Sequence, residues 1–121
     1  MITTPYTIEY YETPQGESPF IEWLESLDFP VRVKIQARID RFETGNLGDH
    51  SPIKGHKGLY EARLTQGPGY RMYFSIEDKR VILLYVGGDK GSQRRDIAKA
   101  AGYMKRRQSN TENGDADQTV E

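Results

Sequence analysis

The sequence predicts an α+β domain in which a small, mainly antiparallel sheet carries an N-terminal helical hairpin and a C-terminal helix. Two observations predict this class. In some segments apolar residues alternate with polar ones, as in strands. In other segments apolar residues recur every three to four positions, as in helices. The chain has 121 residues, 36% of them hydrophobic, which suits one domain with one modest core. The expected order is β-α-α-β-β-β-α, with the helices packed on one face of the sheet.

A strand and two helices account for the first 45 residues. Residues 6–11 are β-branched and aromatic, which is typical of a strand. Ser18 followed by Pro19 fits the start of a helix, and Pro30 starts a second helix that Gly45 ends. The apolar stripes of the two helices are Phe20, Trp23, Leu24 and Leu27, and Val31, Ile35, Ile39 and Phe42. The opposite face of the second helix carries Arg32, Lys34, Arg38, Asp40, Arg41 and Glu43.

A loop and three strands follow. Residues 46–58 form the loop, which is long for so small a domain. Residues 60–65 and 70–76 alternate between apolar and polar side chains and are joined by a turn at 66–69. Residues 81–86 are apolar throughout, so we expect this strand in the interior of the sheet.

Charge is distributed unevenly along the chain, although its net value is only −1. Residues 1–53 have a balance of −5, residues 54–107 one of +8, and residues 108–121 one of −4. The basic segment ends in a helix that Ser92 can N-cap, and it indicates a surface for a polyanion such as nucleic acid. The apolar stripe of that helix is Ile97, Ala101 and Met104. The pattern predicts a folded domain over 1–107 and a disordered acidic tail over 108–121.

Strand alternation gathers charged residues from two strands on one face. The face opposite the core positions carries Glu61, Arg63, Arg71 and Tyr73. Because neighbours across paired strands are about 5–8 Å apart, Arg63 and Arg71 are expected side by side. Two guanidinium groups that close repel each other unless an anion lies between them, and a phosphate diester is such an anion. The alternative is that Arg63 pairs with Glu61 or Glu77 and does nothing more.

Further basic and aromatic residues are expected around this phosphate site. Lys90 follows the neighbouring strand, and Tyr73 and Tyr85 offer rings on which an unpaired base can stack. The expected catalytic residues are Glu61, Arg63, Arg71, Tyr73 and Lys90. The expected RNA-binding residues are Lys54, His56, Lys57, Tyr85, Arg94 and Arg95.

Other kinds of site fit the sequence less well. Lys90-Gly91-Ser92 lacks the residue order of a phosphate-binding loop. Asp49, His50 and His56 lie in a loop without the spacing of a metal site, so we expect no metal and no cofactor. The chain has no cysteine, no signal-peptide pattern and no apolar run long enough to cross a membrane, so a cytoplasmic protein is expected.

Three segments resemble the RelE/ParE superfamily of toxins, and within it the HigB-like branch of addiction module killer proteins. They are GLYEARL at 58–64, GPGYRMYF at 67–74 and LLYVGGDK at 83–90. Residues 46–49 and the helix that carries Phe20 and Trp23 also fit that branch. The likeness covers residues 5–107.

This resemblance implies the toxin of a type II toxin–antitoxin pair, neutralised by a helix-turn-helix antitoxin of the HigA type. RNase members of the superfamily cut messenger RNA on the ribosome, and basic residues on and after the central strands bind the scissile phosphate. Those positions correspond here to Arg63, Arg71 and Lys90. Some relatives carry a lysine where this chain has Glu61, and many have a catalytic Tyr or His near the C-terminus, for which Tyr103 is the aromatic candidate.

The expected reaction is attack of a ribose 2′-hydroxyl on the adjacent phosphate, without a metal. Arg63 and Arg71 would stabilise the added negative charge, while Lys90 would neutralise the phosphate or the leaving 5′-oxygen. Lys90 or Glu61 would serve as general base. Two alternatives are open: a ParE-like poison of DNA gyrase, which shares the fold, and an RNA-binding module that does not cut.

Overall fold

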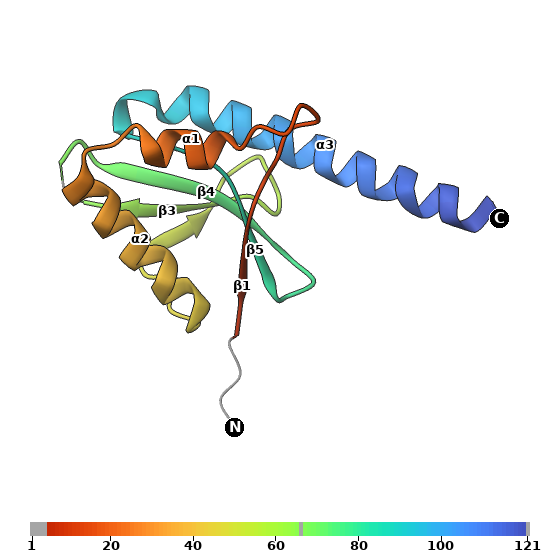
Figure 1. Cartoon of the computed structure of the whole chain (residues 1–121), viewed down its shortest axis with the longest axis horizontal. Coiled ribbons are helices and arrows are strands. Elements are labelled where there is room, and N and C mark those ends of the chain that lie inside the picture. Colours follow the sequence, from red (N-terminus) through yellow and green to blue (C-terminus); the bar gives the residue numbers. More distant parts are fainter. Residues whose placement is uncertain (1–4, 66, 121) are drawn as a thin grey trace.

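The chain forms a five-stranded sheet in the order β1-β5-β4-β3-β2, with helices on both of its sides (Figure 1). The computed structural model describes residues 5–65 and 67–120, and the side chains among them up to residue 109. The elements are β1 (Thr7–Tyr10), α1 (Pro19–Glu25), α2 (Phe29–Glu43), β2 (His50–Pro52), β3 (Tyr60–Leu64), β4 (Tyr70–Glu77), β5 (Val81–Gly88), a 3-10 turn (Lys90–Ser92) and α3 (Gln93–Val120). The α+β class and the predicted order are confirmed, with β2 as one additional strand.

The sheet is mainly antiparallel, as predicted. β1 runs parallel to β5, while β5, β4, β3 and β2 pair with one another in antiparallel fashion. β5 lies between β1 and β4, which confirms the interior position predicted for the apolar run at 81–86. β2 lies inside the predicted loop 46–58, where His50 pairs with Ala62 at the edge of the sheet.

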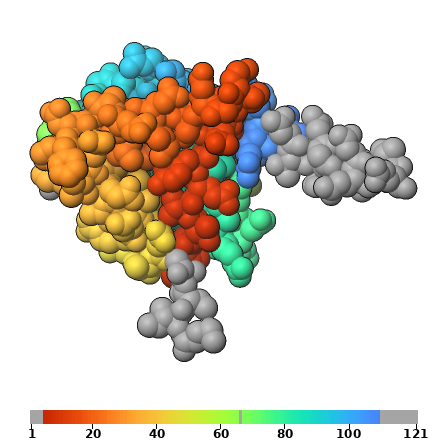
Figure 2. All heavy atoms as spheres, in the orientation of Figure 1, coloured from red at the N-terminus to blue at the C-terminus, as the bar shows by residue number. Residues whose placement is uncertain are grey.

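Helices cover both faces of the sheet, so the prediction that they pack on one face is wrong. α1 and α2 cover one face, and Figure 2 shows this layer from outside, with β1 beside it. α3 covers the other face, where Ala100 and Met104 pack with Tyr73, Leu83 and Tyr85. The physical reason is the composition of β5, which is apolar on both faces and therefore needs cover on both.

Arg38 of α2 departs from the predicted charged, exposed face of that helix. Its side chain is only 8% exposed. The guanidinium donates hydrogen bonds to the carbonyl oxygens of Leu47 at 3.0 Å, Asp49 at 2.8 Å and Arg63 at 2.8 Å. Arg38 thus joins α2 to the loop before β2 and to the end of β3 through their backbone carbonyls.

The helix starts follow capping rules, with one correction. The Ser18 hydroxyl accepts from the Ile21 amide at 3.4 Å, which confirms Ser18 as the N-cap of α1. Ser92, predicted to cap the last helix, lies instead inside a 3-10 turn that Asp89 caps; the Asp89 side chain accepts from the Ser92 amide at 3.1 Å. Ser92 in turn donates to the Asp96 carboxylate in the first turn of α3.

The backbone of α3 continues as a helix to Val120, past residue 107, where the sequence predicts the folded domain to end. The side chains of the predicted acidic tail from residue 110 onward lie outside the described residues, so the division into domain and tail stays a prediction. Within the described ranges, no helix is long and apolar enough to cross a membrane.

Candidate functional site

The pairing of β3 with β4 places Arg63 directly opposite Arg71, and Glu61 directly opposite Tyr73. The predicted juxtaposition of the two arginines is therefore confirmed. They lie on the sheet face that α3 covers, but at the end where α3 only begins. The Arg63 side chain is 30% exposed and that of Arg71 14%.

Glu61 occupies the place between the two arginines. Its side chain is 3% exposed, and its Oε1 accepts from Arg63 Nη1 at 3.0 Å and lies 3.5 Å from Arg71 Nε. Its Oε2 accepts from the amide of Gln93, the first residue of α3, at 2.8 Å. The anion that two adjacent arginines need is therefore supplied by the chain itself. The alternative in which Arg63 pairs with Glu61 is confirmed, whereas Glu77 pairs with Arg107 at 3.2 Å.

Arg63 is bonded through every nitrogen of its guanidinium. Besides Glu61, it binds the Asp49 carboxylate through Nη2 at 2.9 Å and Nε at 3.3 Å, and the Ser51 hydroxyl at 2.9 Å. Hydrogen bonds to Asp49 and Glu61 raise the pKa of Arg63, and the bond from Arg63 lowers the pKa of Asp49. Arg63 is thus engaged within the fold and has no spare donor nitrogen for a ligand.

Arg71 is less engaged than Arg63. Its Nη1 donates to the Gly69 carbonyl at 2.9 Å, and its Nε lies beside Glu61 without meeting the geometry of a hydrogen bond. Gly69 has a φ of +77°, and a Cβ there would lie 3.3 Å from Arg71 Nη1 and 3.6 Å from the Cβ of Lys90. Lys90 is exposed, and its amide donates to the Pro68 carbonyl at 3.4 Å. Arg71 and Lys90 therefore both lie beside Gly69 of the β3–β4 turn; we call these two residues the Arg71–Lys90 corner.

Tyr73 and Tyr85 do not offer rings to a ligand, which corrects the stacking role predicted for both. Each is 0% exposed. The Tyr85 hydroxyl lies 2.8 Å from that of Ser75, and burial raises the pKa of Tyr85 to about 12. Burial, and after it the charge of Glu61, raises the pKa of Tyr73 well above its usual value. Alternation along the strands correctly predicted that Tyr73 shares a face with Glu61. However, α3 covers the rings of Tyr73 and Tyr85 on that face.

The loop after β2 carries three of the residues predicted to bind RNA. Lys54 and Lys57 are exposed and His56 is half-buried, and the loop closes where the Ile53 amide donates to the Leu59 carbonyl at 2.8 Å. This closure lies just before the first residue of β3, which is three residues, or about 10 Å along the strand, from Arg63. That these side chains reach the arginines stays a prediction.

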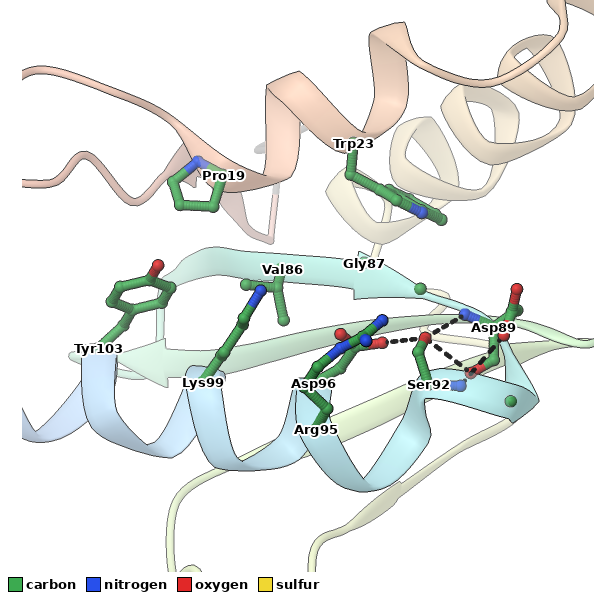
Figure 3. A pocket seen from close by; sticks show the side chains of 12 residues that line it. Pro19, Trp23, Val86, Gly87, Asp89, Ser92, Arg95, Asp96, Lys99 and Tyr103 are labelled. Atoms are coloured by element: carbon green, nitrogen blue, oxygen red, sulfur yellow. Dashed lines mark hydrogen bonds between the residues drawn. The ribbon is translucent and has the colours of Figure 1, made fainter.

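A groove of about 530 Å³ lies between α1 and α3 at the end of β5 (Figure 3). Two glycines at the end of β5 allow Trp23 and Asp96 to pack closely against the strand here. A Cβ on Gly87 would lie 2.1 Å from the Trp23 ring, and a Cβ on Gly88 would lie 1.8 Å from the Asp96 carboxylate. The exposed Arg95 lines this groove, and its neighbour Arg94 is also exposed on the first turn of α3.

No group of three or more His, Cys, Asp and Glu side chains is arranged to hold a metal ion within the part of the chain that the structure describes. Asp49 and His50, considered from the sequence as ligands, are adjacent, but the Asp49 carboxylate is bound by Arg63.

Comparison with known proteins places this fold and site in a family. Residues 22–106 match the family described as "Phage derived protein Gp49-like (DUF891)", and the chain belongs to this family. An uncharacterised protein of Haemophilus influenzae is 38% identical over 82 residues, which cover 67% of this chain and 81% of that protein. The free-state structure of a doubly substituted Escherichia coli toxin RelE matches with a TM-score of 0.62 at 17% identity, covering 81% of this chain and 96% of RelE. The predicted RelE-like fold is thus confirmed.

Proposed function

We propose that this protein is the toxin of a type II toxin–antitoxin pair and cleaves messenger RNA on the ribosome, without a metal. The RelE fold and the Gp49-like family support the toxin class. The observation that supports the cleavage activity is the Arg71–Lys90 corner, where an arginine and an exposed lysine both lie beside Gly69. The proposal includes a HigB-like branch, a HigA-like helix-turn-helix antitoxin and action in the cytoplasm.

The chemistry assigned to the corner is charge stabilisation. When the 2′-hydroxyl attacks the adjacent phosphorus, its proton passes to solvent and a 2′,3′-cyclic phosphate forms. Negative charge grows on the phosphate oxygens, the bond to the 5′-oxygen breaks, and the 5′-oxygen takes up a proton from solvent. Arg71 donates to those oxygens, and Lys90 neutralises the leaving 5′-oxygen. One preorganised donor of this kind typically contributes about a hundredfold or more in rate.

The structure changes the roles proposed for the other residues. Both carboxylate oxygens of Glu61 are held by neighbouring side chains, so we assign Glu61 to orienting Arg71 rather than to accepting the proton of the 2′-hydroxyl. Arg63 is a positioning residue that holds Glu61. Tyr73 keeps its proton and lies behind Glu61. Because no residue of the site is assigned to accept the proton of the 2′-hydroxyl, we expect slow cleavage of free RNA. We expect faster cleavage on the ribosome, which would supply the in-line geometry of the substrate.

The test is Arg71→Ala with purified ribosomes and a defined message, read by primer extension. We expect cleavage to fall by about a hundredfold or more, with Lys90→Ala in the same direction. The matched control is Arg80→Ala, which removes an exposed arginine from the β4–β5 turn and should cleave as the wild type does. If Arg71→Ala cleaves the message at the wild-type rate, Arg71 does not stabilise the charge of the phosphate as assigned here.

Induction of the protein in cells, followed by primer extension on messages and a measurement of DNA breaks, separates the competing functions. Messages that stay intact while DNA breaks accumulate would indicate a gyrase poison. Intact messages and intact DNA, with RNA binding that falls steeply with salt, would indicate an RNA-binding module that does not cut.

A further inference from the structure

A second cationic pocket lies between α2 and the end of β3. It has a volume of about 330 Å³. Its lining consists of Lys34, Ala37, Arg38, Arg41, Asp49, Arg63, Leu64 and Thr65. We call it the α2–β3 pocket. Four of these residues are cationic and one is anionic, so the lining carries a charge of +3.

The positive charge of this pocket is poorly compensated within the fold. Asp49 is the one carboxylate of the lining, and Arg63 binds it through two nitrogens. Arg38 is bonded to backbone carbonyls and to no carboxylate among the described residues. Lys34 and Arg41 are exposed and form no ion pair in the part of the chain that the structure describes. An anion from outside would therefore be attracted to the pocket.

The pocket is a built feature and not a chance gathering of mobile side chains. Arg38 is 92% buried, and its guanidinium is clamped by the carbonyls of three residues. Gly48 makes room for it: a Cβ there would lie 2.7 Å from Arg38 Cζ, and the φ of Gly48 is +63°. Burial and the nearby charge of Arg41 lower the pKa of Arg38, as expected for crowded cations. Lys34, Arg38 and Arg41 follow one another at the spacing of a single helix stripe.

Arg63 connects this pocket to the site described above. It lines the pocket, and it is also the cross-strand partner of Arg71. A nucleic acid strand with one phosphate at the Arg71–Lys90 corner can therefore continue past Arg63 to the end of β3. A pocket of this charge and size fits one phosphate group of such a strand.

We infer that the α2–β3 pocket is a second phosphate-binding site, in which Lys34 and Arg41 bind the RNA backbone away from the cleaved bond and the clamped Arg38 contributes fixed positive charge. The inference rests on the proposed function, because it places RNA at the Arg71–Lys90 corner. The backbone belongs either to the message or to ribosomal RNA, and the two share the same phosphodiester chemistry.

The test uses the double variant Lys34→Ala/Arg41→Ala, which removes two exposed cations and leaves the buried Arg38 in place. Binding of a short 2′-O-methyl RNA, which cannot be cleaved by 2′-hydroxyl attack, is measured by fluorescence anisotropy over a series of salt concentrations. Loss of two phosphate contacts should reduce the slope of log K against log salt by about 1.4, since each contact on a single strand contributes about 0.7. The matched control, Lys105→Ala/Arg106→Ala, removes the same charge from exposed positions on α3.

A second arm identifies the source of the phosphate. Binding to ribosomes without message is measured with the same variants. A loss confined to the oligonucleotide assigns the pocket to the message, and a loss confined to ribosomes assigns it to ribosomal RNA. If the double variant and its control behave alike in both arms while their melting temperatures match that of the wild type, the pocket does not bind phosphate. This outcome is independent of cleavage, so it is distinguishable from a failure of the Arg71→Ala test.

Discussion

Arg63 and Arg71 are equivalent in the sequence pattern and differ in the fold. They stand opposite each other on adjacent strands and share the carboxylate of Glu61. Arg63 also faces the sheet edge, where Asp49 and Ser51 accept from three more of its N–H groups. Arg71 faces the β3–β4 turn and Lys90. Two adjacent arginines are therefore not enough to define a phosphate site, because their neighbours decide which guanidinium stays available to a phosphate.

The largest expected effect comes from removing what the two arginines share. Glu61→Ala should lower the free energy of unfolding by about 3 kcal/mol, because it leaves the partly buried Arg71 without its carboxylate and takes one of two carboxylates from Arg63. Urea denaturation measures this change. Glu77→Ala is the control, since its pair with Arg107 is about a third exposed and should contribute under about 1 kcal/mol. Equal losses in the two variants would mean that Glu61 is not the buried counter-ion described here.

A pH effect of intermediate size is expected in β5, where α3 buries Tyr85. Burial raises its pKa to about 12, whereas an unfolded tyrosine loses its proton near pH 10. Below pH 10 both states keep the proton. Between pH 10 and 12 only the unfolded state releases it, so the free energy of unfolding should fall by about 2 kcal/mol across this window.

Tyr85→Phe checks the source of this alkaline loss, measured by urea denaturation at several pH values. The phenylalanine variant should lose less stability between pH 10 and 12 than the wild type. Ser75→Ala removes the hydrogen bond to Tyr85 but keeps the titrating hydroxyl, so it should retain the alkaline loss. An alkaline loss of the same size in Tyr85→Phe would assign it to other groups.

The smallest expected effect tests whether Arg63 can be made to resemble Arg71. Asp49→Asn removes the carboxylate that holds Arg63 and raises the charge of the α2–β3 pocket lining from +3 to +4. We expect RNA to bind more tightly, with a salt slope steeper by about 0.7, as for one additional phosphate contact. Asp40→Asn makes the same charge change on α2 outside the pocket lining. If the two asparagine variants gain equally, the gain is a general effect of charge and not a release of Arg63.

Local pattern was sufficient for much of this fold. Alternation along residues 60–65 and 70–76 predicted the shared face of Arg63 and Arg71, and Ser18 predicted the start of α1; both are confirmed. The same reasoning misplaced Arg38, because a charged residue on the outer stripe of a helix is usually solvated. Here the loop before β2 folds over it and offers two carbonyls, and the end of β3 offers a third. It also read Tyr85 as a stacking platform, because nothing local showed that α3 crosses that face.

The sequence by itself determined the order of the elements, the basic character of residues 54–107 and the residues that share a face on β3 and β4, since these depend on periodicities of a few residues. Tertiary structure alone decided that Gln93 reaches Glu61 across 32 positions, that Asp49 reaches Arg63 across 14, and that Lys34, Arg38 and Arg41 line a pocket with β3. Such contacts depend on how separate elements pack, and the periodicity of a single segment does not indicate which other segments it packs against.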